Sequence, residues 1–347
     1  MDYHILSQNI RRLRSAKRFS QKALSEASGL SLPSIKNLEL GKAVPRMNTL
    51  LTIAGALDAR LQELFYPVRE LKNVRFRSNK RMQNRENILA DMVRWLDEFN
   101  YLEDILQERM PFTLKDIRNE VSVNDILCAA DLCRKALNLD DIQPVHDLCG
   151  LLESAGVKVF PVSMTSDGFF GLSVGDEDGG PAIVVNVWDR ISVERRIFSA
   201  AHELGHLILH MKAYDVSQTD ENKDEERQAD MFAGHFLMPD KGFKNEWNEA
   251  AGLSLVDRVF KVKRIFRVSY KTVLNRLLEY GKVDKDIWKK FNWAYQRQYK
   301  TKLTFSQEPN ELTAEPFHMA RFDFYADRLS RLTRKAVEED KISLSKG

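Results

Sequence analysis

Short helical patterns fill the first part of the chain. Between residues 5 and 65, apolar side chains recur at the spacing of helices, and little indicates a strand. Ser20 is a favourable cap for the start of one short helix, which Gly29 is placed to end. Ser31 opens a second short helix, and Gly41 follows its last turn. Two short helices joined by a tight turn predict a helix-turn-helix.

Between residues 69 and 110 the chain is first basic and then amphipathic. Residues 69–87 hold 7 basic and 2 acidic side chains without a clear apolar period. They either extend a polyanion-binding surface or form a solvated linker, and we favour the linker. Residues 88–110 place large apolar side chains at helical spacing, which is more typical of a packing or dimerisation face than of a cofactor site.

Beyond residue 120 the pattern changes to a small layer of strands followed by a long helix. Two helical patterns come first, and then apolar runs separated by polar turns predict three strands. Ser192 is a favourable cap for the long amphipathic helix that follows. Together these elements predict an α+β arrangement. The predicted strands cover residues 157–162, 169–174 and 182–186.

Composition excludes several classes of protein. With 347 residues, the chain is expected to form two or three domains. A hydrophobic share of 43% and a charged share of 30% are typical of a globular rather than a disordered protein. No apolar run approaches the roughly 20 residues of a membrane helix, and the N-terminus lacks the profile of a signal peptide. The three cysteines imply no disulfide framework, so we expect a cytoplasmic protein without membrane contact.

The charge is divided unevenly along the chain. Residues 1–87 hold 17 Lys and Arg against 7 Asp and Glu, whereas the remainder holds 36 against 43. A basic front on an acidic body favours a polyanion-binding head joined to a domain with another task. A solvated charged surface would give the same balance, so charge alone leaves both interpretations open.

The long helix carries the pattern His202-Glu203-Leu204-Gly205-His206. Because His202 and His206 are four residues apart, they lie on one face of the helix. Two imidazoles so placed can bind one zinc ion through ring nitrogens at about 2.0–2.1 Å. Glu203 is then placed to take a proton from a water at the metal.

A hydrolytic zinc site needs a third protein ligand, which a second helical pattern can supply. On this helix Glu226 and Asp230 share a face, so Glu226 is the candidate ligand and Asp230 the acceptor that fixes a histidine tautomer. Glu225 points about 100° away and is the weaker choice. The alternative is an acidic helix start without a metal. His210 either serves the cleft or lies on the surface.

Three stretches near the N-terminus form a specific combination, namely Ile10-Arg11-Arg12-Leu13-Arg14, Ser20-Gln21-Lys22-Ala23-Leu24 and Glu39-Leu40-Gly41-Lys42. Together with Pro45 they resemble an Xre/Cro-type DNA-binding domain. The resemblance implies five helices, a recognition helix at residues 31–39 in the major groove of an operator, and a dimer on two half-sites. A helical module that binds a protein is the alternative. The residues implied in DNA contact are Gln21, Lys42 and Arg46 on phosphates, and Ser31, Ser34, Lys36 and Asn37 on base edges or backbone.

Four later stretches, within residues 144–157, 183–186, 195–210 and 226–239, form a second combination. They resemble the ImmA/IrrE family of zinc metallopeptidases, whose known role is to cleave repressor proteins and so release genes for stress response or mobile-element transfer. The resemblance implies Zn²⁺ at His202, His206 and Glu226, with Glu203 as the general base.

We therefore expect a multidomain protein. Its expected function is that of a DNA-binding regulator that also cleaves a regulatory protein, either a repressor or an antitoxin-like protein. The alternative is a repressor or antitoxin whose peptidase-like domain only binds a partner or senses a ligand. The expected parts are an all-α helix-turn-helix head (residues 1–68), a basic linker and amphipathic helix (69–118), an α+β zincin-like metallopeptidase core (119–245) and a helical, helix-turn-helix-like C-terminal segment (246–347). Residues 281–347 of that segment are expected to pack against the peptidase domain, and whether the helices before them contact DNA or the substrate protein is open.

Overall fold

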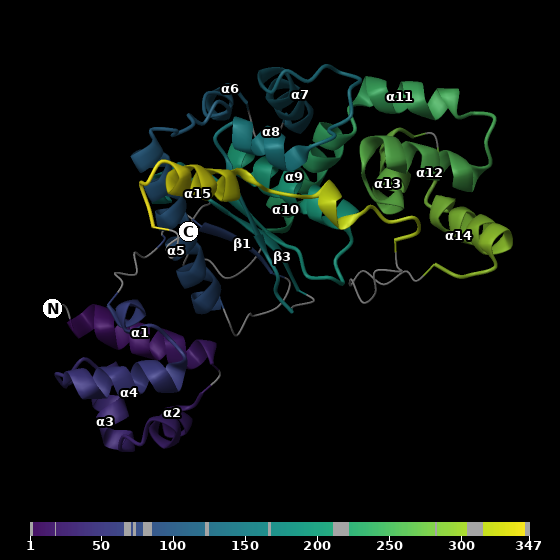
Figure 1. Ribbon diagram of the computed structural model, residues 1–347. Coiled ribbons are helices and arrows are strands. Elements are labelled where there is room, and N and C mark those ends of the chain that lie inside the picture. Colours follow the sequence, from purple (N-terminus) through teal and green to yellow (C-terminus); the bar gives the residue numbers. More distant parts are fainter. Residues whose placement is uncertain are drawn as a thin grey trace. The chain divides into compact units, whose positions relative to one another are not determined.

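The chain divides into two compact units. One consists of residues 1–71 and 82–99, and the other of residues 72–81 and 100–347. Figure 1 shows the elements of both units in a computed structural model. The residues that the structure describes are 3–17, 19–65, 71, 74–78, 85–121, 125–165, 168–210, 222–281, 283–303 and 315–343. Within these residues, no helix combines the length and the apolar character needed to cross a membrane.

The first unit is helical. A core of buried aliphatic side chains, including Leu24, Ile35 and Ile53, holds its helices together. The elements up to residue 64 are α1 (Tyr3–Ala16), α2 (Gln21–Ser28), α3 (Leu32–Glu39), α4 (Met47–Leu57) and a short 3-10 helix (Leu61–Leu64). These are the five helices expected there, the last of them a 3-10 turn. The beginning of α5 (Arg85–Leu106) belongs to the same unit.

The caps that the sequence predicts define α2 and α3. The Ser20 hydroxyl accepts a hydrogen bond from the backbone N–H of Ala23, which starts α2. Gly29 ends that helix with φ at 67°, a conformation that costs glycine little because it has no Cβ atom. Ser31 caps α3 in the same manner as Ser20 caps α2. The predicted helix-turn-helix is therefore confirmed.

The second unit is built on one mixed sheet of four strands. Its order is β1-β3-β4-β2, with β2 parallel to β4 and the other pairs antiparallel. The strands are β1 (Val74–Ser78), β2 (Lys158–Val162), β3 (Phe169–Val174) and β4 (Ala182–Asn186). The last three confirm the predicted strands. Strand β1 was not predicted and lies within the basic segment that was expected to be a linker.

One long helix packs against this sheet, and a second long helix packs against the first. They are α9 (Val193–Leu209), which contacts β3 and β4, and α10 (Lys223–Leu237), which contacts α9 and α7 (Ile126–Ala136). Two shorter helices, α6 (Ile117–Glu120) and α8 (Leu148–Ser154), also contact α9. This packing fixes the spacing between the α9 face that carries the two histidines and the acidic start of α10.

The C-terminal helices belong to the same hydrophobic core. Val259, Phe266 and Phe291 lie in one buried cluster with Ile197 and Leu204 of α9, which confirms the expected packing. A buried ion pair between Lys263 Nζ and Glu194 Oε1, 2.5 Å long, adds a polar tie to α9. The helices that contribute to this cluster are α11 (Asp240–Glu249), α12 (Leu255–Phe266), α13 (Tyr270–Glu279) and α14 (Ile287–Tyr299). The last helix, α15 (Arg328–Glu338), buries Leu332 and Ala336.

Candidate functional site

The two histidines of the His-Glu-x-x-His pattern lie fully buried on α9, together with Glu203. The Ser192 side chain caps the start of this helix, and its apolar residues pack against the strands beneath. Both imidazoles face the first turns of α10, where Glu226 lies. The fold therefore brings three of the sequence-predicted site residues together from two helices.

Three side-chain atoms of this group could hold one metal ion. The Nε2 atoms of His202 and His206 are 2.9 Å apart, and each lies 3.2 Å from a different carboxylate oxygen of Glu226. An ion bound tetrahedrally at about 2.0–2.1 Å would hold its ligand atoms about 3.3–3.4 Å apart. The two 3.2 Å spacings are close to this value, and the 2.9 Å spacing of the two nitrogens is somewhat shorter. Among the described residues this is the group identified as able to hold an ion.

The charge of Glu226 suits the same purpose. Burial acts to raise the pKa of this carboxyl group, but its close contacts with the His202 and His206 rings outweigh burial and hold the pKa well below its usual range. Glu226 is therefore ionised at neutral pH. A partly buried carboxylate and two buried imidazole nitrogens that face it form a ligand set that suits a divalent cation.

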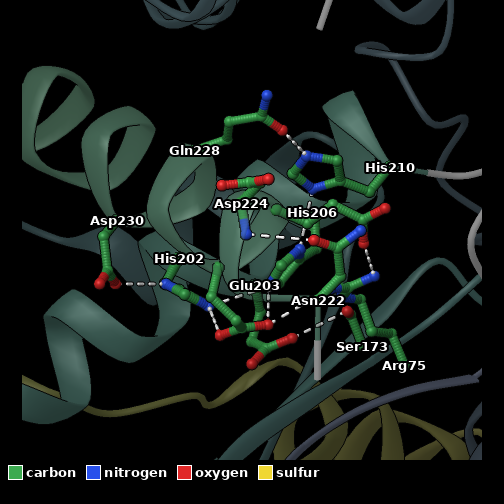
Figure 2. A network of polar contacts seen from close by, with 12 residues as sticks. Arg75, Ser173, His202, Glu203, His206, His210, Asn222, Asp224, Gln228 and Asp230 are labelled. Atoms are coloured by element: carbon green, nitrogen blue, oxygen red, sulfur yellow. Dashed lines mark hydrogen bonds and ion pairs between the residues drawn. The ribbon is translucent and has the colours of Figure 1, made fainter. Parts of the chain in front are cut away.

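A series of contacts sets the tautomer of His206 (Figure 2). The Gln228 carbonyl oxygen, Oε1, lies 2.8 Å from His210 Nε2, and the two Nδ1 atoms of His210 and His206 are 2.9 Å apart. Because a carbonyl oxygen only accepts, His210 donates from Nε2 and accepts at Nδ1. His206 then donates from Nδ1, which leaves the lone pair on its Nε2 directed at the candidate site. Burial lowers the pKa of both rings, which favours their neutral forms.

Asp230 acts on the other histidine. Its Oδ1 atom lies 2.7 Å from His202 Nδ1, so the ring donates to the carboxylate and turns Nε2 toward Glu226. This is the position that the sequence analysis gave Asp230. The carboxylate is about half exposed, whereas the His202 ring is fully buried.

Glu203 lies below the histidines, next to strand β3. Its Oε2 atom accepts a hydrogen bond of 2.8 Å from the Ser173 hydroxyl, and both side chains are buried. Gly171 leaves the space for this carboxylate, since a Cβ atom there would lie 3.1 Å from Glu203 Oε1 and 2.9 Å from the Val184 carbonyl oxygen. The strand thus positions the carboxylate beside the candidate metal site.

Glu225 and Arg75 form an ion pair at the edge of this group. The Arg75 guanidinium contacts Glu225 closely and also lies 3.3 Å from Glu226 Oε1. Glu225 therefore meets a cation of strand β1, while its neighbour Glu226 meets the histidines. Arg75 was not predicted as a site residue, although the alternation Val74-Arg75-Phe76-Arg77 is the period-2 signal of a strand.

Ser173 and Gln228 were not predicted as site residues from the sequence, and the place of His210 was left open between the cleft and the surface. Gln228 lies two residues before Asp230, so it projects from nearly the opposite side of α10 and does not share the face of the predicted acidic residues. Ser173 is a small polar residue within a buried, otherwise apolar strand, a pattern that indicates a hydrogen bond without revealing its partner. His210 is buried at the end of α9.

In the helix-turn-helix unit, most of the residues expected to contact DNA lie on or beside α3. Ser31 caps the helix, and its hydroxyl oxygen lies 2.8 Å from that of Ser34. The Gln21 amide donates a 2.7 Å hydrogen bond to Glu39 Oε2, so a phosphate contact by this residue stays a prediction. The remaining four have exposed side chains, namely Lys36, Asn37, Lys42 and Arg46.

Comparisons with known proteins agree with this arrangement. Residues 152–278 match a peptidase family described as the IrrE N-terminal-like domain, a segment that contains β2, β3, β4, α9 and α10. Residues 10–64 match a helix-turn-helix family. No curated protein matches the chain. The chain therefore combines an Xre-type helix-turn-helix domain with a domain of the IrrE/ImmA-like metallopeptidase family.

Proposed function

We propose that this protein is a DNA-binding transcriptional regulator whose second unit is a zinc-dependent endopeptidase. The observation that carries the proposal is the convergence of two imidazole nitrogens and one ionised carboxylate beside a second, buried carboxylate. The substrate that we propose is a regulatory protein, either a repressor or an antitoxin-like protein. Support for a peptide substrate comes from the peptidase family that residues 152–278 match.

Zinc is the metal that we propose for this site. Two histidines and one glutamate are a ligand set of hydrolytic zinc sites, which keep a further position open. The ligands that we propose are His202 Nε2, His206 Nε2 and the Glu226 carboxylate. Asp230 and His210 would hold the two rings in the required tautomers, as their contacts with the Nδ1 atoms support.

We propose that Glu203 moves the protons of the reaction. When bound, zinc supplies a Lewis acid that polarises the scissile carbonyl and makes water a better nucleophile. The Glu203 carboxylate takes a proton from the attacking water and then delivers it to the nitrogen of the leaving amine. Ser173 holds one oxygen of Glu203, so the carboxylate keeps one orientation during both transfers.

The first unit would bring this activity to an operator. We propose that α3 enters the major groove, with Ser31, Ser34, Lys36 and Asn37 toward base edges or backbone. Gln21, Lys42 and Arg46 would contact phosphates, and two copies of the chain would occupy two half-sites. The excess of basic residues in the first 87 positions supports attraction to DNA.

Substitution of Glu203 by glutamine tests the peptidase proposal. New protein N-termini would be mapped by mass spectrometry in cells that produce the wild type or Glu203→Gln. We expect at least one regulatory protein to gain a new N-terminus only with the wild type, while both purified proteins hold the same amount of zinc. The same set of N-termini in both cultures would contradict the mechanism.

A further inference from the structure

Of the three strands within the peptidase-family match, β2, β3 and β4, strand β3 is outermost on one side, and one of its edges has no partner among them. On its other side β3 pairs with β4, and β4 pairs with β2. These three strands and both helices of the candidate metal centre lie within the family match at residues 152–278. The outer edge of β3 is therefore open in that part of the fold, and an open strand edge is a template for an extended peptide.

This edge borders the candidate active site. Ser173 of β3 donates to Glu203, and the missing side chain of Gly171 makes room for the same carboxylate. A strand added along β3 therefore runs beside Glu203, and side chains opposite Ser173 and Gly171 project toward the face that α9 covers. An extended peptide bound there would lie next to the proposed zinc ligands.

In this protein the edge is filled by a segment from far earlier in the chain. Strand β1 pairs antiparallel with β3, with Val74 opposite Val174 and Arg75 opposite Ser173. Figure 1 shows the two strands side by side. The segment of the second unit that contains β1, residues 72–81, is joined at both ends to residues of the helix-turn-helix unit. It lies outside both family matches.

One side chain of β1 reaches the candidate metal centre. The Arg75 side chain is about nine-tenths buried, and its guanidinium contacts Glu225 and lies 3.3 Å from Glu226 Oε1. In the ion pairs of the described residues, the two proposed histidine ligands contact Glu226, whereas Glu225 contacts Arg75. Glu225 is therefore the carboxylate that balances a cation at this edge. The pair of Arg75 and Glu225 gives the edge a preference for an arginine at this position.

From these observations we infer that the outer edge of β3 is a strand-binding site for an extended peptide that places an arginine against Glu225, and that β1 is its built-in, displaceable occupant. Naming the peptide a substrate rests on the proposed function, whereas the binding itself does not. Tethered β1 competes with a free peptide at an effective concentration in the millimolar range. Access to the site therefore requires that β1 leave the edge.

The test uses the full chain with Glu203→Gln, so that a bound peptide stays intact. Arg75→Glu places a carboxylate against Glu225 and Glu226 and should displace β1 by like-charge repulsion. Lys80→Glu makes the same charge change outside the paired residues 74–78 and is the matched control. The probe is a fluorescent peptide with the sequence of residues 72–81, and a peptide of the same composition in scrambled order reports unspecific attraction.

We expect Arg75→Glu to bind the probe at least ten times more tightly than Lys80→Glu does, and more tightly than it binds the scrambled peptide. Hydrogen exchange of residues 169–174 should rise in Arg75→Glu and fall again when the probe is added. Adding Glu225→Gln to Arg75→Glu should remove about tenfold of the probe's affinity, because the probe's arginine loses its carboxylate.

Two results would overturn the inference. If exchange at residues 169–174 rises but the probe binds no better than the scrambled peptide, the edge is not a strand-binding site. If exchange stays at the level of the control, β1 is a permanent strand. Glu225→Gln alone is a milder variant, because the amino-acid sequence of β1 stays the same and only the partner of Arg75 is lost. It too should raise hydrogen exchange at residues 169–174. An unchanged rate there contradicts displaceability even if Arg75→Glu does not fold.

Discussion

His206 and His210 form a hydrogen bond between their Nδ1 atoms, which lie 2.9 Å apart. Two neutral rings can meet in this way only if one donates and the other accepts. Gln228 decides which, because its carbonyl oxygen requires the hydrogen of His210 to be on Nε2. An amide on α10 therefore determines which nitrogen of His206 is open to a metal.

Loss of this amide should weaken metal binding. Gln228→Leu frees the tautomer of His210, and we expect zinc affinity to fall about 10- to 100-fold, as is common when the partner of a metal-binding histidine is removed. Gln228→Glu keeps an accepting oxygen and should retain most of the affinity. Competition with a chromophoric chelator measures both constants. Equal affinities for all three proteins would show that Gln228 does not set the tautomer.

In the helix-turn-helix unit, a buried ion pair should carry much of the stability. Glu39 is 3% exposed, and its carboxylate accepts from both Arg14 and Gln21. We expect Glu39→Ala to cost about 3–5 kcal/mol, because it leaves the Arg14 cation buried without a counter-charge. The exposed pair of Lys22 and Glu26 provides the control.

Glu26→Ala should change stability by less than about 1 kcal/mol, since exposed pairs contribute little. Hydrogen exchange of the amides in α2 and α3 reports the local free energy of opening in the full chain. Similar losses of protection in Glu39→Ala and Glu26→Ala would contradict the role given to the buried carboxylate.

The proposed DNA contacts predict two different kinds of defect. If Lys42 contacts a phosphate, Lys42→Ala weakens binding to all duplexes alike and lowers the salt slope, in a plot of log affinity against log salt, by about 1. If Asn37 reads a base edge, Asn37→Ala changes the preferred sequence and leaves the salt slope unaltered. Selection from a random duplex library, followed by titration at several salt concentrations, separates the two. Lys115→Ala, in the second unit, should change neither.

The stability of the second unit should depend on pH through Glu153. This residue is 3% exposed, and burial raises its pKa to about 7 from an ordinary value of 4.5. The folded protein therefore holds this proton up to a higher pH than the unfolded chain does. Stability attributable to the neutral form is fully present below about pH 4.5 and is lost as pH rises through about 7.

Glu153→Gln keeps a neutral side chain at every pH. We expect it to stabilise the protein at pH 8 by up to about 3 kcal/mol relative to the wild type and to have little effect at pH 4.5. Thermal unfolding followed by circular dichroism at both pH values measures the difference. A variant that is no more stable than the wild type at pH 8 would show that Glu153 is not held neutral by burial.

Local signals in the sequence were sufficient for much of the fold. The caps Ser20, Ser31 and Ser192 each mark the start of a helix because a hydroxyl at that position satisfies a free backbone N–H. Residues 169–174 and 182–186 are predicted as strands because they are short, mainly apolar runs on either side of a polar turn. The helical spacing of the His-Glu-x-x-His pattern likewise places two imidazoles on one face without tertiary information.

Contacts made only by the tertiary fold were beyond the sequence. Arg75 lies 150 positions from Glu225, and no periodic pattern connects a strand with the helix that its side chain reaches. Nothing local in the sequence distinguishes Ser173 and Gln228 from other polar residues. Their roles come from contacts with Glu203 and His210, which only the packing around α9 brings about. Strand β1 was missed because five residues within a basic run resemble a linker, although their alternation of apolar and basic side chains was the available signal.

Metal content of the purified full chain tests the central claim most directly. Inductively coupled plasma mass spectrometry would compare the wild type, His206→Ala and His146→Ala, whose histidine is exposed and outside the candidate site. The account predicts about one zinc per chain in the wild type and in His146→Ala, and loss of zinc in His206→Ala. A wild type purified without chelators that holds no zinc, or zinc retained in His206→Ala, would contradict it.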